Sequence, residues 1–197
     1  LEPFSTAMGS MKFNNSETKV KCFGVDSSNN PIASKNVEIL FYNSEDDFAI
    51  KLKTKEGEEV ILYKTTEENN SFEENYEEVK KKQSGYSGKT TFEKDDMLRI
   101  PFIKVNAEIN YDELCGREII NSEYYIKQAL QTIDFELNNI GGSVKSEAVI
   151  DATQKAITKN ARKMIFDSDF ILYLKEENKE QPYFALKVDN TDILLAE

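Results

Sequence analysis

The stretch Ile133-Asp-Phe-Glu-Leu-Asn-Asn-Ile-Gly-Gly142 decides how this chain is interpreted. Its first five residues place an apolar side chain at every second position, which predicts a β-strand. The two glycines then interrupt the pattern, and the next hydrophobic run does not begin until Met164. A connection of that length is unusual inside a compact domain, and such loops are usually either functional or disordered. The sequence therefore predicts a strand, a long loop and a second strand.

Two hydrophobic segments follow the long loop. Phe166-Asp-Ser-Asp-Phe-Ile-Leu-Tyr-Leu174 and Phe184-Ala-Leu-Lys-Val188 both carry closely spaced apolar residues. Strand faces with this spacing pack together, so we expect three adjacent strands to share one core. The expected members of this core are Phe135, Leu137, Phe166, Phe170, Leu172, Phe184, Leu186 and Val188.

The first half of the chain contains further strands and a helix. Apolar and polar residues alternate in segments 19–23, 36–42 and 47–53, and a short apolar run occupies 60–63. Turn residues separate these segments, which is typical of antiparallel strands. Residues 71–83 are expected to form a helix with the apolar face Phe72, Tyr76 and Val79, because Ser71 and Glu74 have the spacing of a capping box.

The middle of the chain is less regular. Segment 97–106 alternates as a strand, and Pro101 restricts it to an edge or to a position whose N–H is not needed. Residues 111–117 are expected to form a single helical turn. Segment 123–137 is ambiguous between helix and strand in its first half and is a strand in its second half.

Composition excludes several classes of function. The chain has 197 residues and a net charge of −11, which argues against nucleic acid and anionic membranes as partners. It contains no histidine, so a Ser-His-Asp triad, a Cys-His dyad and His-ligated zinc are all excluded. No phosphate-binding or paired-carboxylate motif is recognisable. We therefore expect neither an enzyme nor a cofactor.

The two cysteines and the acidic clusters are interpreted as structural. Cys22 and Cys115 either form a disulfide or remain as two thiols, and the tendency of unpaired cysteines to be buried favours two buried thiols. The clusters at 45–47 and 93–96 lack the glycine and terminal glutamate of an EF-hand. We expect them to be exposed turns without a metal.

Four segments resemble the serpin family, the large protease inhibitors that trap their targets by loop insertion. Phe135-Glu-Leu-Asn-Asn-Ile-Gly141 is similar to the hinge that precedes the serpin reactive loop. Phe166-Asp-Ser-Asp-Phe-Ile-Leu-Tyr-Leu174 is similar to Phe-Asp-Arg-Pro-Phe-Leu-Phe-Leu-Ile, which follows that loop. The terminal Phe184-Ala-Leu-Lys-Val-Asp-Asn-Thr191 and the upstream Ile100-Pro-Phe-Ile-Lys-Val-Asn-Ala-Glu-Ile-Asn-Tyr-Asp112 match two further serpin segments in order and rough spacing.

This resemblance implies an α+β fold, mostly antiparallel β-sheets with a few helices, like the C-terminal half of a serpin. Residues 1–10 end in Gly9-Ser10 before Met11 and are interpreted as a remnant of cloning. Residues 11–197 are expected to form a single domain. The sequence departs from the family at Asn139-Ile140, where serpins carry two glutamates, and at Asp169, where they carry proline.

The resemblance also implies a reactive loop after Gly141. When a loop inserts into a sheet, every second residue faces the protein interior and must be small and uncharged. Counted from Gly142, every second residue of the hinge is Gly142, Val144, Ser146 and Ala148. The intervening residues, which begin with Ser143, would face water. The family's loop length places the scissile bond at Lys155–Ala156, with Lys159 or Arg162 as alternatives.

The implied function is protease inhibition. A basic residue at the scissile bond implies a trypsin-like partner, and we expect residues 148–162 to be exposed, mobile and preferentially nicked. The alternative is a non-inhibitory binding or structural module. Because serpins are about twice as long, the strand beside the insertion gap is missing, and we expect this chain alone not to insert its loop fully. The oligomeric state is left open, and the protein is expected to be soluble, either cytoplasmic or secreted.

Overall fold

The computed structural model describes residues 7–26, 34–54, 57–67, 71–120, 122–138 and 161–197. Within these residues one sheet has the order β1-β2-β6-β9. Its strands are β1 (Ala7–Lys12), β2 (Lys19–Val25), β6 (Met97–Pro101) and β9 (Lys163–Ile165). β9 pairs parallel with β6, whereas the other pairs are antiparallel. Strand β1 includes residues 7–10, so part of the segment that we set aside as a cloning remnant pairs with β2.

A five-stranded antiparallel sheet has the order β11-β10-β5-β4-β3. Its strands are β3 (Val37–Ser44), β4 (Asp47–Lys53), β5 (Glu58–Lys64), β10 (Phe170–Glu176) and β11 (Phe184–Val188). The antiparallel arrangement predicted for segments 36–42, 47–53 and 60–63 is therefore confirmed. The prediction for segment 19–23 is only partly right, because this strand is β2 and belongs to the other sheet.

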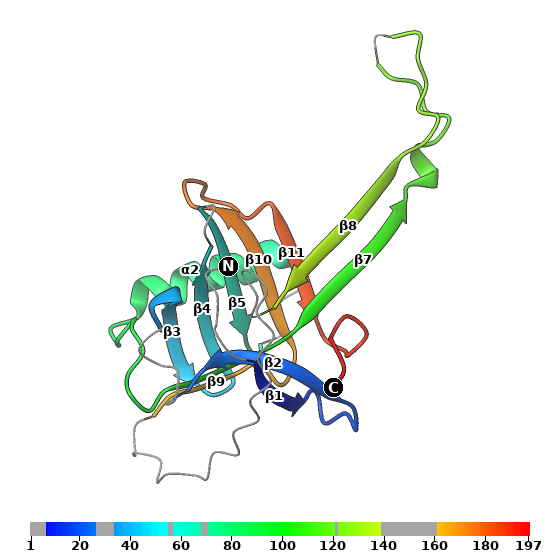
Figure 1. The fold of residues 1–197 in the computed structure, drawn as a ribbon. Helices are drawn as coiled ribbons and strands as arrows, with labels where there is room; N and C mark the ends of the chain where they lie inside the picture. Colours follow the sequence, from blue (N-terminus) through cyan, green and yellow to red (C-terminus); the bar gives the residue numbers. More distant parts are fainter. Residues whose placement is uncertain (1–6, 27–33, 55–56, 68–70, 121, 139–160) are drawn as a thin grey trace.

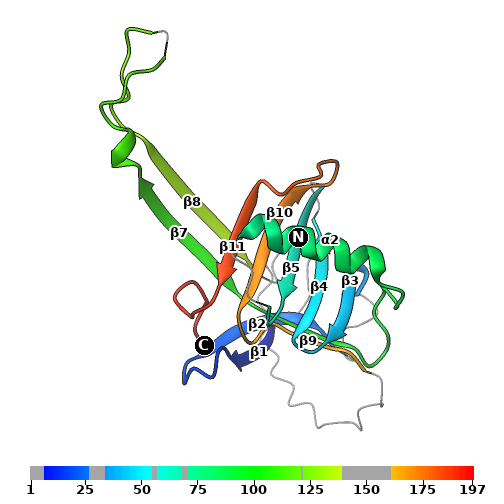
Figure 2. The ribbon, with the colours of Figure 1, turned by 180° about the vertical axis from the view of Figure 1, so that it is seen from behind.

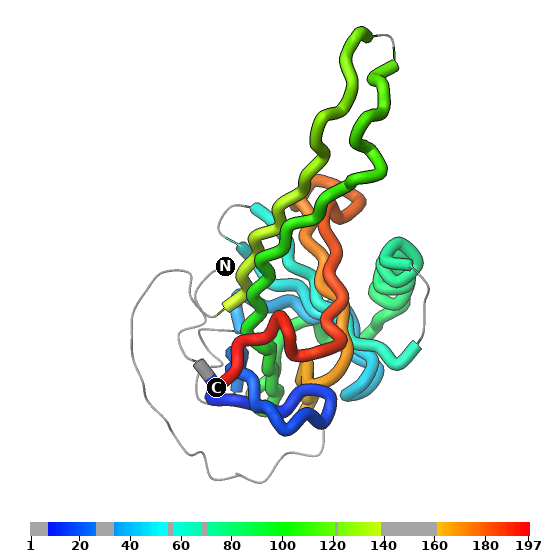
Figure 3. Tube along the Cα trace, turned by 90° about the vertical axis from the view of Figure 1, so that its right-hand side faces the viewer, coloured from blue at the N-terminus to red at the C-terminus, as the bar shows by residue number. Residues whose placement is uncertain are grey.

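Strands β7 (Ile103–Asn110) and β8 (Leu130–Leu137) form a two-stranded hairpin that projects from the body as an arm (Figures 1 and 3). Only the root of the arm is buried, as shown by Ile103 and Leu137, and its distal half is exposed. The segment predicted as one strand over 97–106 is divided at Phe102, after Pro101 ends β6. The predicted helical turn within 111–117 is the short 3₁₀ helix η2 (Asp112–Leu114). A second such helix, η1 (Ser34–Asn36), precedes β3.

Helix α2 (Phe72–Gly85) lies across one face of the five-stranded sheet (Figures 1 and 2). The Ser71 side chain accepts a hydrogen bond from the Glu74 backbone N–H, as the capping box predicts. Tyr76 and Val79 are buried, but the prediction that Phe72 shares their face is wrong, because Phe72 is 45% exposed. No helix in the described residues is long and apolar enough to span a membrane.

The main core lies between the two larger sheets and the root of the hairpin. All eight predicted core residues contact it, and Phe135, Phe184 and Leu186 are only partly buried. The expectation of three adjacent strands is wrong, however, because β8 pairs with β7 and not with β10 or β11. Both cysteines are unpaired; Cys22 is buried as expected, whereas Cys115 is exposed.

The last residues of the chain connect the four-stranded sheet to the hairpin. Lys21 N–H donates to the Leu195 carbonyl at 2.8 Å, and Glu197 N–H donates to the Lys19 carbonyl at 3.0 Å. On the hairpin side, Lys104 N–H donates to the Ile193 carbonyl at 2.8 Å. The terminal segment therefore holds β2 and β7 in place. Together these elements form an α+β fold dominated by antiparallel sheets, as predicted.

Candidate functional site

The candidate site is built around the connection from β8 to β9. The predicted hinge residues and the predicted scissile bond all lie outside the described residues, and they remain predictions. These residues are Gly141, Gly142, Ser143, Val144, Ser146, Ala148, Lys155 and Ala156, together with the alternative Lys159. What the structure describes is how each end of this connection is attached to the fold.

The upstream end leaves strand β8. Leu137 is 2% exposed and pairs with Ile103 at the root of the hairpin. The side chain of Asn138 donates to Glu136 at 2.5 Å. Among the described residues, β7 is the only strand that pairs with β8. The connection therefore begins at a strand whose second edge has no strand beside it in the described part of the chain.

The downstream end is fixed by Arg162. Its Nε and Nη2 atoms donate to Oδ2 of Asp96 at 3.1 and 2.5 Å, and its backbone N–H donates to Oδ1 at 2.9 Å. Nη1 and Nη2 also donate to the carbonyls of Lys89 and Thr91, at 2.5 and 2.7 Å. Burial lowers the pKa of the Arg162 guanidinium, but hydrogen bonds and charge attraction from Asp96 outweigh burial and raise it overall.

This arrangement corrects three predictions. Arg162 is 9% exposed, so it does not offer its side chain to a protease as an alternative scissile residue. Its inclusion in the exposed and mobile segment 148–162 is likewise wrong. Asp96 is 1% exposed, so the cluster at 93–96 is not simply an exposed turn.

Strand β9 is held by its neighbours as well as by Arg162. Met97 N–H donates to the Arg162 carbonyl at 2.9 Å, and Phe166 N–H donates to the Arg99 carbonyl at 3.0 Å. Lys163 N–H donates to the Tyr42 hydroxyl at 3.3 Å. The downstream end of the connection is therefore built into the four-stranded sheet.

A second feature is a cavity of about 540 Å³ between α2 and the five-stranded sheet. Tyr76, Ile61 and Leu40 supply apolar wall, and lysines and glutamates line the rest. Within the lining, Glu59 bonds both Lys51 at 3.0 Å and Lys175 at 2.6 Å. The full lining is Leu40, Lys51, Glu59, Ile61, Tyr76, Lys80, Gln83, Lys175, Lys179 and Glu180.

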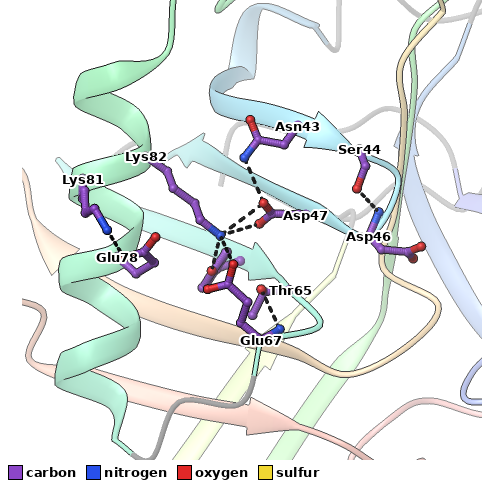
Figure 4. A network of polar contacts seen from close by, with 10 residues as sticks. Asn43, Ser44, Asp46, Asp47, Thr65, Glu67, Glu78, Lys81 and Lys82 are labelled. Carbon is purple, nitrogen blue, oxygen red and sulfur yellow. Dashed lines mark hydrogen bonds and ion pairs between the residues drawn. The ribbon is translucent and has the colours of Figure 1, made fainter.

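The position of α2 over this cavity is fixed by a polar network near the C-terminal end of the helix (Figure 4). Lys82 Nζ donates to both carboxylate oxygens of Asp47 at 2.9 and 3.1 Å and to the Tyr63 hydroxyl at 3.2 Å. Glu67 lies 3.4 Å from the same nitrogen, and the Phe41 ring centroid lies 5.7 Å from it. Burial opposes the charge of Lys82, yet Asp47 and Tyr63 raise its pKa.

Sequence reasoning missed these ion pairs. Asp96 and Arg162 are 66 residues apart, and Asp47 and Lys82 are 35 apart. Each residue belongs to a locally polar segment, where charged side chains are normally solvated. The one available signal is that Arg162 lies two residues before the hydrophobic run that begins at Met164, because a charge that is drawn into a buried region requires a partner.

No protein-family model matches the sequence, and no curated protein matches it either. The structure is similar to that of Serpin48, a highly specific serpin of the insect Tenebrio molitor, with a TM-score of 0.53 and 15% identity. It is also similar to thyroxine-binding globulin in complex with thyroxine, with a TM-score of 0.58 and 13% identity. Each match covers 95% of this chain and 52% of the other. The chain therefore has a serpin-like fold that spans about half the length of these serpins.

Proposed function

We propose that this chain is a serpin-type protein that presents residues 139–160 as a reactive loop to a trypsin-like protease. The observation that supports it is the attachment of this connection: it starts at β8 and ends at the buried Arg162 that precedes β9. In this proposal, the segment that joins these two attachment points enters a protease active site as an extended peptide. In this proposal Lys155–Ala156 is the scissile bond, and the chain is a ligand of an enzyme rather than an enzyme.

Trapping of the protease requires more than presentation. In the described residues β8 is paired on one side only. A loop inserted beside it would be paired along one edge and would expose its other backbone groups. We therefore propose that the chain by itself binds and is cleaved without full insertion. Cleavage should then leave the melting temperature nearly unchanged, and a rise of tens of degrees would contradict this part of the proposal.

The test uses catalytically inactive trypsin, which binds a presented loop without cutting it. We expect the wild-type chain to bind and Lys155→Ala to lose most of this binding. Lys179→Ala, at an exposed lysine between β10 and β11, is the matched control and should bind like the wild type. Active trypsin separates the two modes, because an SDS-stable adduct indicates inhibition and clean cleavage at Lys155 indicates presentation alone. Equal binding by Lys155→Ala would overturn the proposal.

A second candidate is a non-inhibitory binding module, and the cavity beside α2 favours it. One structural neighbour is a globulin in complex with thyroxine. An aromatic carboxylate of this kind would place its rings against Tyr76 and Ile61. Lys80 and Lys179, which also line the cavity, would face the carboxylate.

Titration with thyroxine tests this candidate directly. Binding should raise the melting temperature of the wild type, and Tyr76→Ala should reduce the affinity. Lys80→Ala should reduce it as well, whereas Lys81→Ala is a control, because its side chain is 79% exposed and does not line the cavity. The absence of any thyroxine-dependent shift in the wild type would argue against this ligand class.

A further inference from the structure

Arg162 binds three separate points of the segment that leads into β6. Its guanidinium contacts the Asp96 carboxylate and the carbonyls of Lys89 and Thr91. Asp96 has a second role, because its Oδ2 accepts from the Glu93 backbone N–H at 2.8 Å. One buried charge pair thus organises residues 89–96 and the start of β9 together.

The two ends of the β8–β9 connection are therefore attached by different kinds of contact. Near the upstream end, β8 is paired with β7 alone in the described residues. At the downstream end, an arginine with little exposure makes five hydrogen bonds, and breaking a buried pair leaves an uncompensated charge. Such a pair resists separation more strongly than a surface ion pair does.

We infer that Arg162, acting through Asp96, is the positioning residue that fixes the downstream end of the presented segment and closes the Arg162–Lys163 bond to proteases. The positioning part of this inference rests on the proposed function. The closure of the bond follows from burial alone. A protease must bind several extended residues around a bond, and here residues 162–166 bond to β6 in the four-stranded sheet.

Two measurements test the role of the Arg162–Asp96 pair, called the clamp below, and neither depends on the proposed function. In Asp96→Asn, the amides of Met97 and Phe166, which bond across β6 and β9, should exchange hydrogen roughly tenfold faster or more. The amide of Leu62, in the five-stranded sheet, should be unaffected. Limited trypsin digestion of Asp96→Asn should produce a new fragment that begins at Lys163, and the wild type should not. Asp95→Asn, at the exposed neighbouring carboxylate, is the matched control.

Binding of inactive trypsin then tests positioning. Asp96→Asn should bind several-fold more weakly although Lys155 is intact, and Asp96→Glu, which keeps the charge, should recover part of the loss. If the wild type does not bind trypsin, the proposed function fails. The hydrogen-exchange and cleavage results still show whether the Arg162–Asp96 pair fixes the start of β9. If Asp96→Asn keeps wild-type exchange at Met97 and gains no cut after Arg162, the inference is overturned. If Asp96→Asn also accelerates hydrogen exchange at Leu62, this variant has lost its fold. The exchange at Met97 and the cleavage after Arg162 are then measured in Asp96→Glu instead.

Discussion

The rings of Phe135 and Phe184 lie 5.7 Å apart and are tilted by 35°, and this contact joins the projecting hairpin to the five-stranded sheet. Both side chains are partly buried against the main core. Because an aromatic pair adds about 0.5–1.5 kcal/mol to simple burial, Phe135→Ala should lower the free energy of unfolding by about 1–3 kcal/mol. Urea denaturation measures the loss. Phe72→Ala is the control at an exposed ring, and an equal loss there would contradict a specific role for this contact.

Phe170 lies at the centre of an aromatic cluster. It is 2% exposed, and its ring lies 5.0 Å from that of Phe166 and 6.2 Å from that of Phe13. Phe170→Ala should therefore reduce the free energy of unfolding by about 3–5 kcal/mol. Tyr124→Ala, at a residue 75% exposed on the arm, should change it by less than about 0.5 kcal/mol. A small loss at Phe170 would show that this core tolerates a cavity there.

Gly24 allows β2 and β6 to approach each other closely. A Cβ atom at this position would lie 1.9 Å from the backbone oxygen of Leu98, which is far inside contact distance. Gly24→Ala should therefore force the two strands apart and lower the melting temperature. Gly85→Ala is the matched control, because nothing lies within 4 Å of a Cβ there and alanine favours the helix. Thermal unfolding should show a lower melting temperature for Gly24→Ala and a higher one for Gly85→Ala. A wild-type melting temperature for Gly24→Ala would contradict the backbone clash.

Glu59 links stability to acid pH. Burial raises the pKa of Glu59, but hydrogen bonds and charge attraction from Lys175 and Lys51 outweigh burial and lower it below the ordinary 4.5. A carboxyl with a depressed folded pKa stabilises the protein above its unfolded pKa, and this contribution disappears as the pH falls through the folded value. Glu59→Gln should therefore show a weaker loss of stability below pH 4.5 than the wild type. An identical loss of stability in Glu59→Gln and the wild type below pH 4.5 would contradict this link.

The elements of this fold are readable from the sequence where local patterns decide them. The alternation in Ile133–Leu137 predicts β8, and the Ser71 cap predicts the start of α2, because each depends on neighbouring residues only. The partner of each strand is not readable in the same way. β2 resembles β3 in its alternation, yet it pairs with β6, whose residues lie about 75 positions later.

The candidate site shows the same limit. The connection between β8 and β9 is evident from its composition, whereas the Arg162–Asp96 pair depends on a fold that brings two polar segments together. Phe72 illustrates a smaller failure. Its spacing places it on the helix face of Tyr76, but it is the first residue of the helix, and there it is exposed.

The hydrogen bonds of residues 193–197 to β2 and β7 have a consequence for biosynthesis. Residues near the start of the described chain acquire these partners only after nearly all of it has been translated. Tyr63 of β5 likewise pairs with Ile171 of β10, more than one hundred residues later. Folding dominated by such distant pairings is slow, and incomplete chains expose unpaired strand edges meanwhile. We therefore expect a nascent chain that ends before β10 to expose the edge of β5 that β10 covers in the folded protein.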